Sequence, residues 1–233
     1  MEMVDGEPSV ARLWVVVPAF NESEVIGAAL RGLAPWFPNV VVVDDGSSDD
    51  TGTLALASGA VVLRHAVNLG AGAATQTGID YALRHGATHI CTFDADGQHD
   101  PSTIGVMLAA LEDSGAQVAL GSRFLGSTID MPPLRRLVIN LAVHYTRWTT
   151  GSYFSDTHNG LRMLTAAAAR ACRITQPGMA HGSELLATIV REKMAYIEVP
   201  TTVTYSKYSL AKGQKLDNSV KILFDLLYAA WSR

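Results

Sequence analysis

Short apolar runs alternate with longer, more polar segments along the first half of this sequence, and this alternation limits the possible folds more than any other feature. The runs have the length and residue types of buried strands and occupy residues 13–17, 40–44, 61–64, 89–93 and 118–122. The segments between them fit helices at 22–33, 50–58, 71–85 and 101–114. Strand, helix and strand in this order predict βαβ units, and therefore an α/β fold with a mostly parallel central sheet flanked by helices.

The second half is less regular, but nothing in it marks a domain boundary. We expect helices at 133–150, 182–193 and 216–232, a short strand or hairpin at 156–163, and a strand at 197–205. No internal repeat, low-complexity run or linker interrupts the 233 residues, so we expect a single domain. The N-terminus is polar and unlike a signal peptide, and no apolar stretch approaches the roughly 20 residues of a membrane-spanning helix.

Charge is distributed unevenly along the chain. Residues 1–119 hold 15 acidic and 4 basic side chains, a net charge of −11, whereas residues 120–233 hold 7 acidic and 14 basic side chains, a net charge of +7. An acidic half suits a divalent cation, and a basic half suits an anionic substrate or an anionic membrane face. The alternative interpretation is that the two halves simply neutralise each other across the fold.

Three carboxylate-rich sequences follow predicted strands. They are PAFNE (18–22), DDGSSDDT (44–51) and DADGQHD (94–100). The carboxyl ends of parallel strands lie on one rim of the sheet, where ligands of such folds bind, so we expect these loops to converge there. Asn21 followed by Glu24 also fits a capping box at the start of the first helix.

Asp94 and Asp96 are the central pair in this prediction. Two carboxylates one residue apart on a loop can bind one hard cation whose remaining ligands are diphosphate oxygens, and Gln98 or His99 could add a ligand. The bound cation would neutralise a departing diphosphate. The alternative is a solvated acidic loop, since Asp is common in turns.

Asp45 and the glycines of NLGAGAA (68–74) are weaker signals. Asp45 is suited to accept hydrogen bonds from a nucleobase or ribose, although its loop also fits a plain turn and helix cap. Gly70 and Gly72 could cradle a phosphate at a helix start, but the spacing matches neither a Walker sequence nor the dinucleotide fingerprint. Close helix–sheet packing is the favoured reading of these glycines.

Six motifs in one order carry a family resemblance. PAFNE, DDGSSDDT, NLGAGAA, DADGQHDP, GSR (121–123) and DTHNGLRM (156–163) resemble the family 2 inverting glycosyltransferases of the Rossmann-like GT-A fold. Within that family the chain looks most like dolichyl-phosphate mannose synthases and bacterial polyprenyl-phosphate glycosyltransferases. The resemblance implies a flexible N-terminus at about 1–12, a nucleotide-sugar and metal half at 13–123, and an acceptor half at 124–233 with a mobile loop at about 206–215 and a C-terminal helix.

The resemblance also implies a role for each matching residue. The nucleoside pocket would be lined by Pro18, Phe20, Glu22 and Asp45 and flanked by Val43. Asp94, Asp96 and Gln98 would hold Mg²⁺ or Mn²⁺ against the diphosphate. Arg123 would contact a donor or acceptor phosphate, and Arg135 or Arg136 would meet the acceptor phosphate.

One stretch departs from the family pattern. A loop resembling R-x-x-G-x-S-K closes over the diphosphate in relatives, and here it reads SLAKGQKL (209–216). Gly213 and Lys215 match, but Leu210 replaces the arginine and Gln214 the serine. Lys207 or Lys212 is the candidate substitute, although a lysine lacks the bidentate fork of arginine.

These residues together predict a metal-dependent, inverting transfer of a sugar from a UDP- or GDP-linked donor to a polyprenyl phosphate. A phosphate oxygen is already an anionic nucleophile, so catalysis reduces to positioning and to charge neutralisation by the metal that Asp96 helps to hold, by Arg123 and by the basic loop. The alternative is transfer to a hydroxyl of a glycan or other soluble acceptor in cell-surface polysaccharide synthesis. That reaction needs a base. Asp156 is the candidate, unless it is a structural carboxylate bonded to Arg162. His158 and His181 are weaker candidates, and Glu184 could orient Arg123.

The expected location is the cytoplasmic face of a membrane, reached as a peripheral protein and with a small membrane protein as a possible partner. Helix 133–150 carries arginine and tryptophan side chains that suit a membrane interface, although an amphipathic helix more often covers its own core. A nucleotidyltransferase is disfavoured because no basic, Gly-rich triphosphate loop occurs near the N-terminus. The intact DAD and GSR motifs argue against a non-catalytic binding module. Nucleic acid binding is not expected, because no stacking aromatic motif accompanies the basic residues.

Overall fold

The computed structural model describes residues 3–4 and 7–212 of the chain, and these form one α/β unit around a mixed sheet. The sheet has seven strands in the order β5-β4-β3-β6-β8-β7-β9. Their bounds are β3 Leu13–Ala19, β4 Val40–Asp44, β5 Val61–Arg64, β6 His89–Thr92, β7 Val118–Ile129, β8 Arg162–Thr165 and β9 Tyr196–Thr204. Neighbouring strands are parallel except β8, which runs antiparallel to both β6 and β7. The predicted fold class, a mostly parallel sheet flanked by helices, is confirmed.

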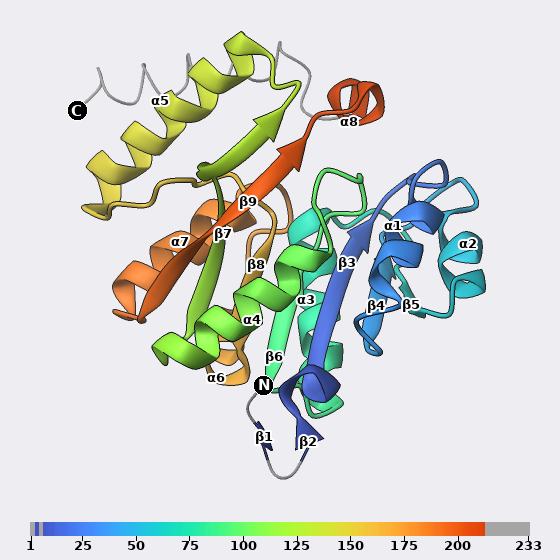
Figure 1. The fold of residues 1–233 in the computed structure, drawn as a ribbon. Helices are drawn as coiled ribbons and strands as arrows, with labels where there is room; N and C mark the ends of the chain where they lie inside the picture. The colour runs from blue at the N-terminus through green and yellow to red at the C-terminus, as the bar shows by residue number, and fades with distance from the viewer. Residues whose placement is uncertain (1–2, 5–6, 213–233) are drawn as a thin grey trace.

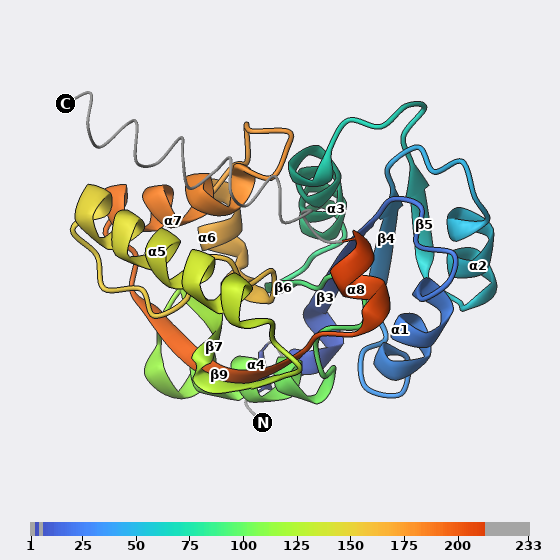
Figure 2. The same cartoon turned by 90° about the horizontal axis from the view of Figure 1, so that it is seen from above.

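Helices cover both faces of this sheet because its strands are apolar on both sides. The helices are α1 Ile26–Leu33, α2 Thr51–Ala57, α3 Ala71–Arg84, α4 Ser102–Ser114, α5 Pro133–Thr150, α6 Ala166–Ala171, α7 His181–Arg191 and α8 Lys207–Lys212. Val15 and Val17 of β3 pack in the core layer of α1, α2 and α4, whereas Trp14 and Val16 pack with α3, α6 and α7. Figure 2 shows α4 on one side of the sheet and α3, α6 and α7 on the other.

The first helix begins later than predicted, so the capping-box prediction is wrong. α1 starts at Ile26, and its N-terminus has no side-chain cap. Asn21 adopts a left-handed backbone (φ 53°), and its side-chain oxygen accepts a hydrogen bond from the backbone N–H of Ser48 at 2.8 Å. The backbone N–H of Asn21 in turn donates to Ser47 Oγ at 2.9 Å. Tertiary contacts between the first two carboxylate loops therefore replace the local helix cap.

β7 is longer than the predicted strand at 118–122, because it continues to Ile129 along β9 after an irregularity between Ser122 and Ser127. The predicted hairpin at 156–163 is instead a loop that leads into β8 at Arg162. Near the N-terminus, β1 (Met3–Val4) pairs with β2 (Glu7–Pro8), and a short 3-10 helix follows at Ser9–Arg12. Part of the segment expected to be a mobile loop at 206–215 is helical in α8.

The expected C-terminal helix at 216–232 and Lys215 lie outside the described residues. No helix within residues 7–212 has the combination of length and apolarity that crossing a bilayer would require.

Candidate active site

A cavity of about 520 Å³ opens where β3, β4 and β6 end, and the three carboxylate loops meet there. Phe20 and Glu22 from the first loop, Asp45 from the second, and Asp94 and Asp96 from the third all line it. The convergence expected from the parallel sheet is therefore present. The opposite wall comes from α5, α7 and the loop at 157–160, and α8 crosses above it.

Asp45 fixes the wall at one end of the cavity. Its carboxylate accepts hydrogen bonds from the backbone N–H groups of Leu69 and Gly70 at 2.9 and 2.8 Å. His65 Nδ1 lies 2.7 Å from Asp45 Oδ1, and Nε2 of the same ring lies 3.0 Å from Thr77 Oγ1. Nδ1–H donates to the carboxylate, and the contact of Nε2 with Thr77 holds the other side of the ring. Asp45 thus holds the NLG loop in place beside the pocket predicted for the nucleoside.

Val43 lies apart from the other residues predicted for this pocket. Pro18, Phe20, Glu22 and Asp45 line the cavity, but Val43 is fully buried within β4, paired with Pro18 on one side and Leu63 on the other. Val43 precedes the last residue of β4, Asp44, so its side chain is covered by the neighbouring elements and does not reach the cavity.

Glu22 connects the first loop to α8, which lies nearly 190 residues later in the chain. Tyr208 donates its hydroxyl to Glu22 Oε2 at 2.7 Å, and Lys212 Nζ lies 2.8 Å from Glu22 Oε1. The same ammonium donates to the backbone oxygens of Phe20 and Asn21. Of the two lysines considered as substitutes for the family arginine, Lys212 lines the cavity, and in this state its charge is already paired.

Asp94 and Asp96 lie side by side on the rim beyond β6. Burial raises the pKa of Asp94, and burial together with the Asp94 charge raises the pKa of Asp96 to about 6. Like charges held this close favour a bound cation, and Gln98 of the same loop also lines the cavity. Within the described chain no third His, Cys, Asp or Glu completes a metal cluster. The residues therefore fit a metal whose other ligands come from a substrate or water, as Mg²⁺ commonly has.

His99, the other residue considered as a ligand, also lines the cavity. Its ring is buried, its Nε2 lies 3.8 Å from Asp94 Oδ2, and its Nδ1 has no hydrogen-bond partner among the described residues. Burial lowers the pKa of His99 to about 4, so the ring is neutral at pH 7.

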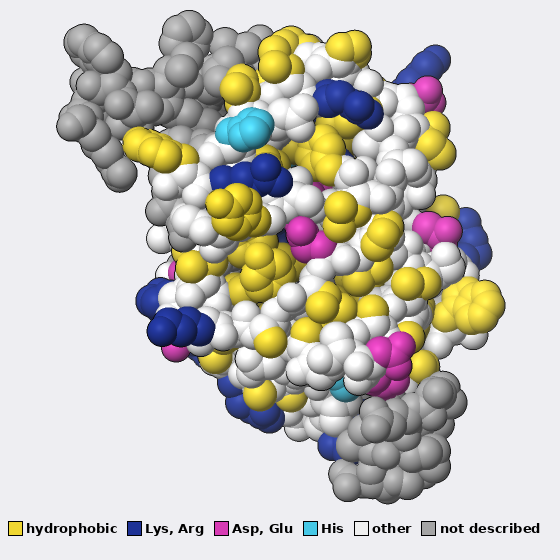
Figure 3. Space-filling view, turned by 60° about the vertical axis from the view of Figure 1, so that its left-hand side comes forward, with side chains coloured by type: hydrophobic (Ala, Val, Ile, Leu, Met, Phe, Trp, Pro, Cys, Tyr) yellow, Lys and Arg dark blue, Asp and Glu magenta, His cyan; other side chains and the backbone are white. Residues whose placement is uncertain are grey.

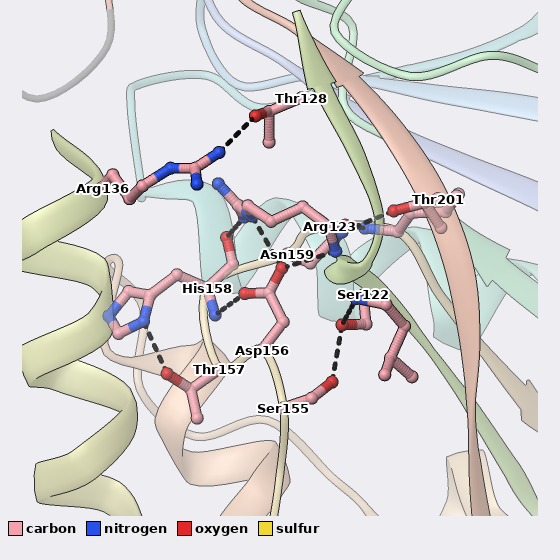
Figure 4. Close-up of polar contacts among 12 residues, drawn as sticks. Ser122, Arg123, Thr128, Arg136, Ser155, Asp156, Thr157, His158, Asn159 and Thr201 are labelled. Atoms are coloured by element: carbon pink, nitrogen blue, oxygen red, sulfur yellow. Dashed lines mark hydrogen bonds and ion pairs between the residues drawn. The ribbon is translucent and has the colours of Figure 1, made fainter. Parts of the chain in front are cut away.

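Arg123 and Asp156 form a buried ion pair at the other end of the cavity (Figure 4). Arg123 Nε lies 2.6 Å from Asp156 Oδ2, its two terminal nitrogens donate to Tyr205 Oη at 2.6 Å and to the His158 backbone oxygen at 2.7 Å, and its backbone N–H also donates to Asp156. Burial alone would lower the pKa of Arg123, but Asp156 and Tyr205 raise it above its ordinary value. The guanidinium is thus fixed, charged and positioned at the cavity wall.

Asp156 is placed differently from a free base. It is 3% exposed and does not line the cavity, and its second oxygen accepts the backbone N–H of His158. The ion-pair partner is Arg123, not Arg162 as the structural alternative supposed. Glu184 does not orient Arg123 either, since it accepts hydrogen bonds from the backbone N–H groups of Thr175 and Gln176.

The two arginines of α5 take different positions. Arg135 lines the cavity and lies over the ring of Tyr205 at 5.2 Å. Arg136 donates to Thr128 Oγ1 at 3.1 Å and is not part of the cavity wall (Figure 4). The structure therefore brings Arg135, rather than its neighbour, to the site.

Arg162 lines the cavity, although the sequence did not predict a place for it there. It was considered only as a partner of Asp156, yet it lines the floor of the cavity between β8 and the start of α7. The sequence feature that could have indicated a site role for Arg162 is its position at the start of a strand, shortly after Asn159 and Gly160. This position predicts a place at the site only if β8 is known to run antiparallel, because the first residue of β8 then lies on the ligand-binding rim beside the end of β6.

Comparison with known proteins points to one family. The model of glycosyl transferase family 2 matches residues 14–165. An uncharacterised protein of Methanocaldococcus jannaschii is 35% identical over 92% of this chain and 90% of its own length. A UDP-N-acetylglucosamine–dolichyl-phosphate N-acetylglucosaminyltransferase of Methanococcus voltae is 28% identical over 92% of this chain and 94% of its own. A polyprenol monophosphomannose synthase of Mycolicibacterium smegmatis is 30% identical over 86% and 80%.

A solved structure shares the fold. The glucosyl-3-phosphoglycerate synthase of Mycobacterium tuberculosis, in complex with Mn²⁺, UDP-glucose and phosphoglyceric acid, superposes with a TM-score of 0.70 at 19% identity. The superposition covers 98% of this chain and 84% of that one.

Proposed function

The chain belongs to glycosyl transferase family 2 and is a glycosyltransferase of the GT-A fold, and we propose that it transfers a sugar, with inversion, from a nucleoside diphosphate to a polyprenyl phosphate with the help of Mg²⁺ or Mn²⁺. The donor would be UDP- or GDP-linked. Two relatives that span most of the chain are named for transfer to dolichyl phosphate or for polyprenol monophosphomannose synthesis.

One observation carries the choice of acceptor. The carboxylates that line the cavity within the described residues are Glu22, Asp45, Asp94 and Asp96, and all four belong to the half predicted to bind donor and metal. Asp156, the candidate base of the acceptor half, is buried against Arg123. A hydroxyl acceptor needs a base, whereas a phosphate oxygen does not. His158 and His181 also line the cavity, but burial lowers the pKa of each, which makes them weaker bases for a hydroxyl. A cavity end with arginines and no free carboxylate therefore favours a phosphate acceptor.

The donor half would bind the nucleoside between Phe20 and the loop held by Asp45. Asp94, Asp96 and Gln98 would hold the metal ion, which would stabilise the negative charge of the departing diphosphate as a Lewis acid. The chain's own contribution is to keep these groups fixed before substrate arrives, since preorganised charges cost no reorganisation during the reaction.

Arg123 and Arg135 would orient the acceptor phosphate at the opposite end. The Arg123 side chain is held by three hydrogen bonds, and Arg135 rests against the Tyr205 ring, so neither side chain has to be ordered by the substrate. An acceptor held there would face the donor across the cavity, as an inverting displacement requires.

The outer face of α5 supports a location at the cytoplasmic face of a membrane. Residues 133–150 contain no Asp or Glu, and arginines begin the helix beside the cavity mouth. Large apolar side chains stay exposed along the helix at Leu134, Leu137, Leu141 and Trp148. Figure 3 shows a face of the molecule on which hydrophobic side chains lie beside those of lysine and arginine. Such a surface fits anionic headgroups and the upper acyl region. The small membrane partner stays a prediction.

The test is a transfer assay with purified protein, labelled UDP- or GDP-linked sugars, Mn²⁺ and a short-chain polyprenyl phosphate. We expect label to enter the organic phase only when metal is present, and Asp96→Asn to abolish it. Phosphoglyceric acid serves as a soluble phosphate acceptor for comparison. If every donor leaves the label aqueous while nucleotide still binds, transfer to polyprenyl phosphate is refuted.

A further inference from the structure

Arg162 is a buried cation for which the proposed roles give no use. Its side chain lies on the cavity floor at the start of β8 and is only 6% exposed. Nε donates to the backbone oxygen of Asn159 at 3.0 Å, and one terminal nitrogen donates to the backbone oxygen of Gly182 at 3.3 Å. The other terminal nitrogen, Nη2, donates to nothing within residues 7–212.

The charge of Arg162 is not neutralised by an adjacent carboxylate, as the charges of Arg123 and Lys212 are. Arg123 lies 2.6 Å from Asp156, and Lys212 lies 2.8 Å from Glu22. No carboxylate of the described chain lies within 4.0 Å of the Arg162 guanidinium. A buried charge is stable only if an opposite charge compensates it, so Arg162 requires an anion in this cavity.

Burial lowers the pKa of Arg162, and the charges of Asp94 and, to a smaller extent, Asp156 oppose this effect, so Asp94 is the larger of two sources of such compensation. The compensation from Asp94 lasts only while the acidic pair has no cation. A divalent ion on Asp94 and Asp96 offsets both of their charges, and Arg162 is then left with Asp156, whose carboxylate is already paired with Arg123. The metal-loaded cavity would therefore need an additional anion beside the metal site.

We propose that Arg162 binds a phosphate group on the cavity floor, with its free Nη2 edge as the donor and the backbone oxygens of Asn159 and Gly182 holding its orientation. This inference rests on the proposed function and deepens it by adding a third arginine to the phosphate-binding set. The phosphate is supplied by the donor diphosphate or by the acceptor, and the experiment below separates these two sources.

Gly182 is the second element of the site. A Cβ at this position would lie 3.1 Å from Arg162 Nη2 and 3.5 Å from Nη1, closer to Nη2 than ordinary contacts allow. The lack of a side chain at the start of α7 thus leaves room for the guanidinium. Gly182→Ala keeps the charge and shifts the donor edge, while alanine favours the helix. If Arg162 had only a structural role, Gly182→Ala would bind phosphate as tightly as the wild type.

The experiment measures binding and kinetics on the full chain with Mn²⁺. Calorimetry gives the Kd of UDP, GDP and inorganic pyrophosphate for the wild type and for Arg162→Gln, Arg162→Lys and Gly182→Ala, and transfer assays give the KM for polyprenyl phosphate. Arg31→Gln, on the exposed surface of α1, is the matched control. Thermal melting shows which variants fold.

We expect Arg162→Gln to weaken either nucleotide and pyrophosphate binding or the KM for polyprenyl phosphate by about 10- to 100-fold, the range for a lost charged hydrogen bond. A rise in Kd identifies the donor diphosphate, and a rise in KM alone identifies the acceptor. The binding constants of Arg162→Lys should lie between those of the wild type and Arg162→Gln, because lysine keeps the positive charge but lacks the bidentate guanidinium. Gly182→Ala should weaken the same quantity at least threefold.

The inference is overturned if folded Arg162→Gln keeps all these constants within twofold of the wild type. If that variant does not fold, unchanged constants in Gly182→Ala overturn it instead. A wild-type chain that binds pyrophosphate but neither nucleotide contradicts the proposed function and leaves the phosphate site standing.

Discussion

Gly160 offers a way to displace Asp94, a proposed metal ligand, by a substitution at another residue. An added Cβ at this position would lie 1.9 Å from Asp94 Oδ2 and 2.6 Å from Asp94 Cγ. Nonbonded contacts settle near 3.5 Å, so in Gly160→Ala the carboxylate must retreat by roughly 1.5 Å. Gly160 does not have a left-handed backbone, so alanine itself introduces no strain there.

The expected effect on metal binding is large and the effect on folding small. Metal–ligand distances tolerate only about 0.2 Å, so the displaced Asp94 should lower Mn²⁺ affinity by at least 10- to 100-fold. Rotation of the carboxylate costs about 0.5–1.5 kcal/mol, and replacing a glycine recovers about 0.4–1 kcal/mol through the unfolded chain. The free energy of unfolding without metal should therefore change by no more than about 1 kcal/mol.

The assay is a Mn²⁺ titration by calorimetry in the presence of UDP or GDP, with thermal melting of the metal-free protein alongside. Gly105→Ala is the control, because a Cβ at that position on α4 meets nothing within 4 Å. That variant should melt slightly higher and bind Mn²⁺ normally. If Gly160→Ala binds Mn²⁺ as tightly as the wild type, Asp94 is not a ligand in the position described.

Three further outcomes follow from single contacts. Asp156→Asn leaves a buried guanidinium unpaired, so it should destabilise the fold by about 3–5 kcal/mol in denaturant melts; full stability would refute the ion pair. His65→Leu should raise the nucleotide Kd about tenfold, and His65→Asn, which can still donate, should restore most of it by calorimetry. Burial raises the pKa of Asp49, but hydrogen bonds from Thr51 and Ser23 outweigh it and lower the pKa to about 2. Because the folded pKa lies below the ordinary 3.8, its stabilisation is complete above about pH 4 and is lost as pH falls toward 2; the melting difference from Asp49→Asn should disappear there.

The sheet and its ligand-binding rim could be predicted because their signals are local. The strands of the first half are short and mainly apolar, and each carboxylate motif lies at or directly after the end of one of them. A parallel sheet then brings the three loops together without any knowledge of long-range contacts. Asp94, Asp96 and Asp45 were placed at the cavity by this reasoning alone.

The acceptor half resisted the same reasoning because its site depends on contacts between distant residues. Arg123 and Asp156 are 33 positions apart and meet only because β8 enters the sheet antiparallel between β6 and β7. Glu22 and Tyr208 are 186 positions apart, and no pattern in either segment indicates that they share a hydrogen bond. Asn21 shows the same effect at short range, since a contact to Ser48 overrides a good local capping signal.

The charge asymmetry of the chain can be interpreted more sharply with the ion pairs in view. If the acidic and basic halves existed to neutralise each other, most ion pairs would cross between them. Within the described residues two Lys or Arg ion pairs do, Glu22 with Lys212 and Asp80 with Arg173, whereas three stay inside one half: Asp44 with Arg64, Arg123 with Asp156, and Arg191 with Glu192. Ion pairs between the halves therefore do not neutralise the excess charge of either half. Carboxylates of the acidic half and arginines of the basic half both line the cavity, at opposite ends. A ligand that brings a cation to the acidic end and phosphates to the basic end satisfies both, which is the charge pattern of the metal-bound nucleotide sugar and phosphate acceptor in the proposed reaction.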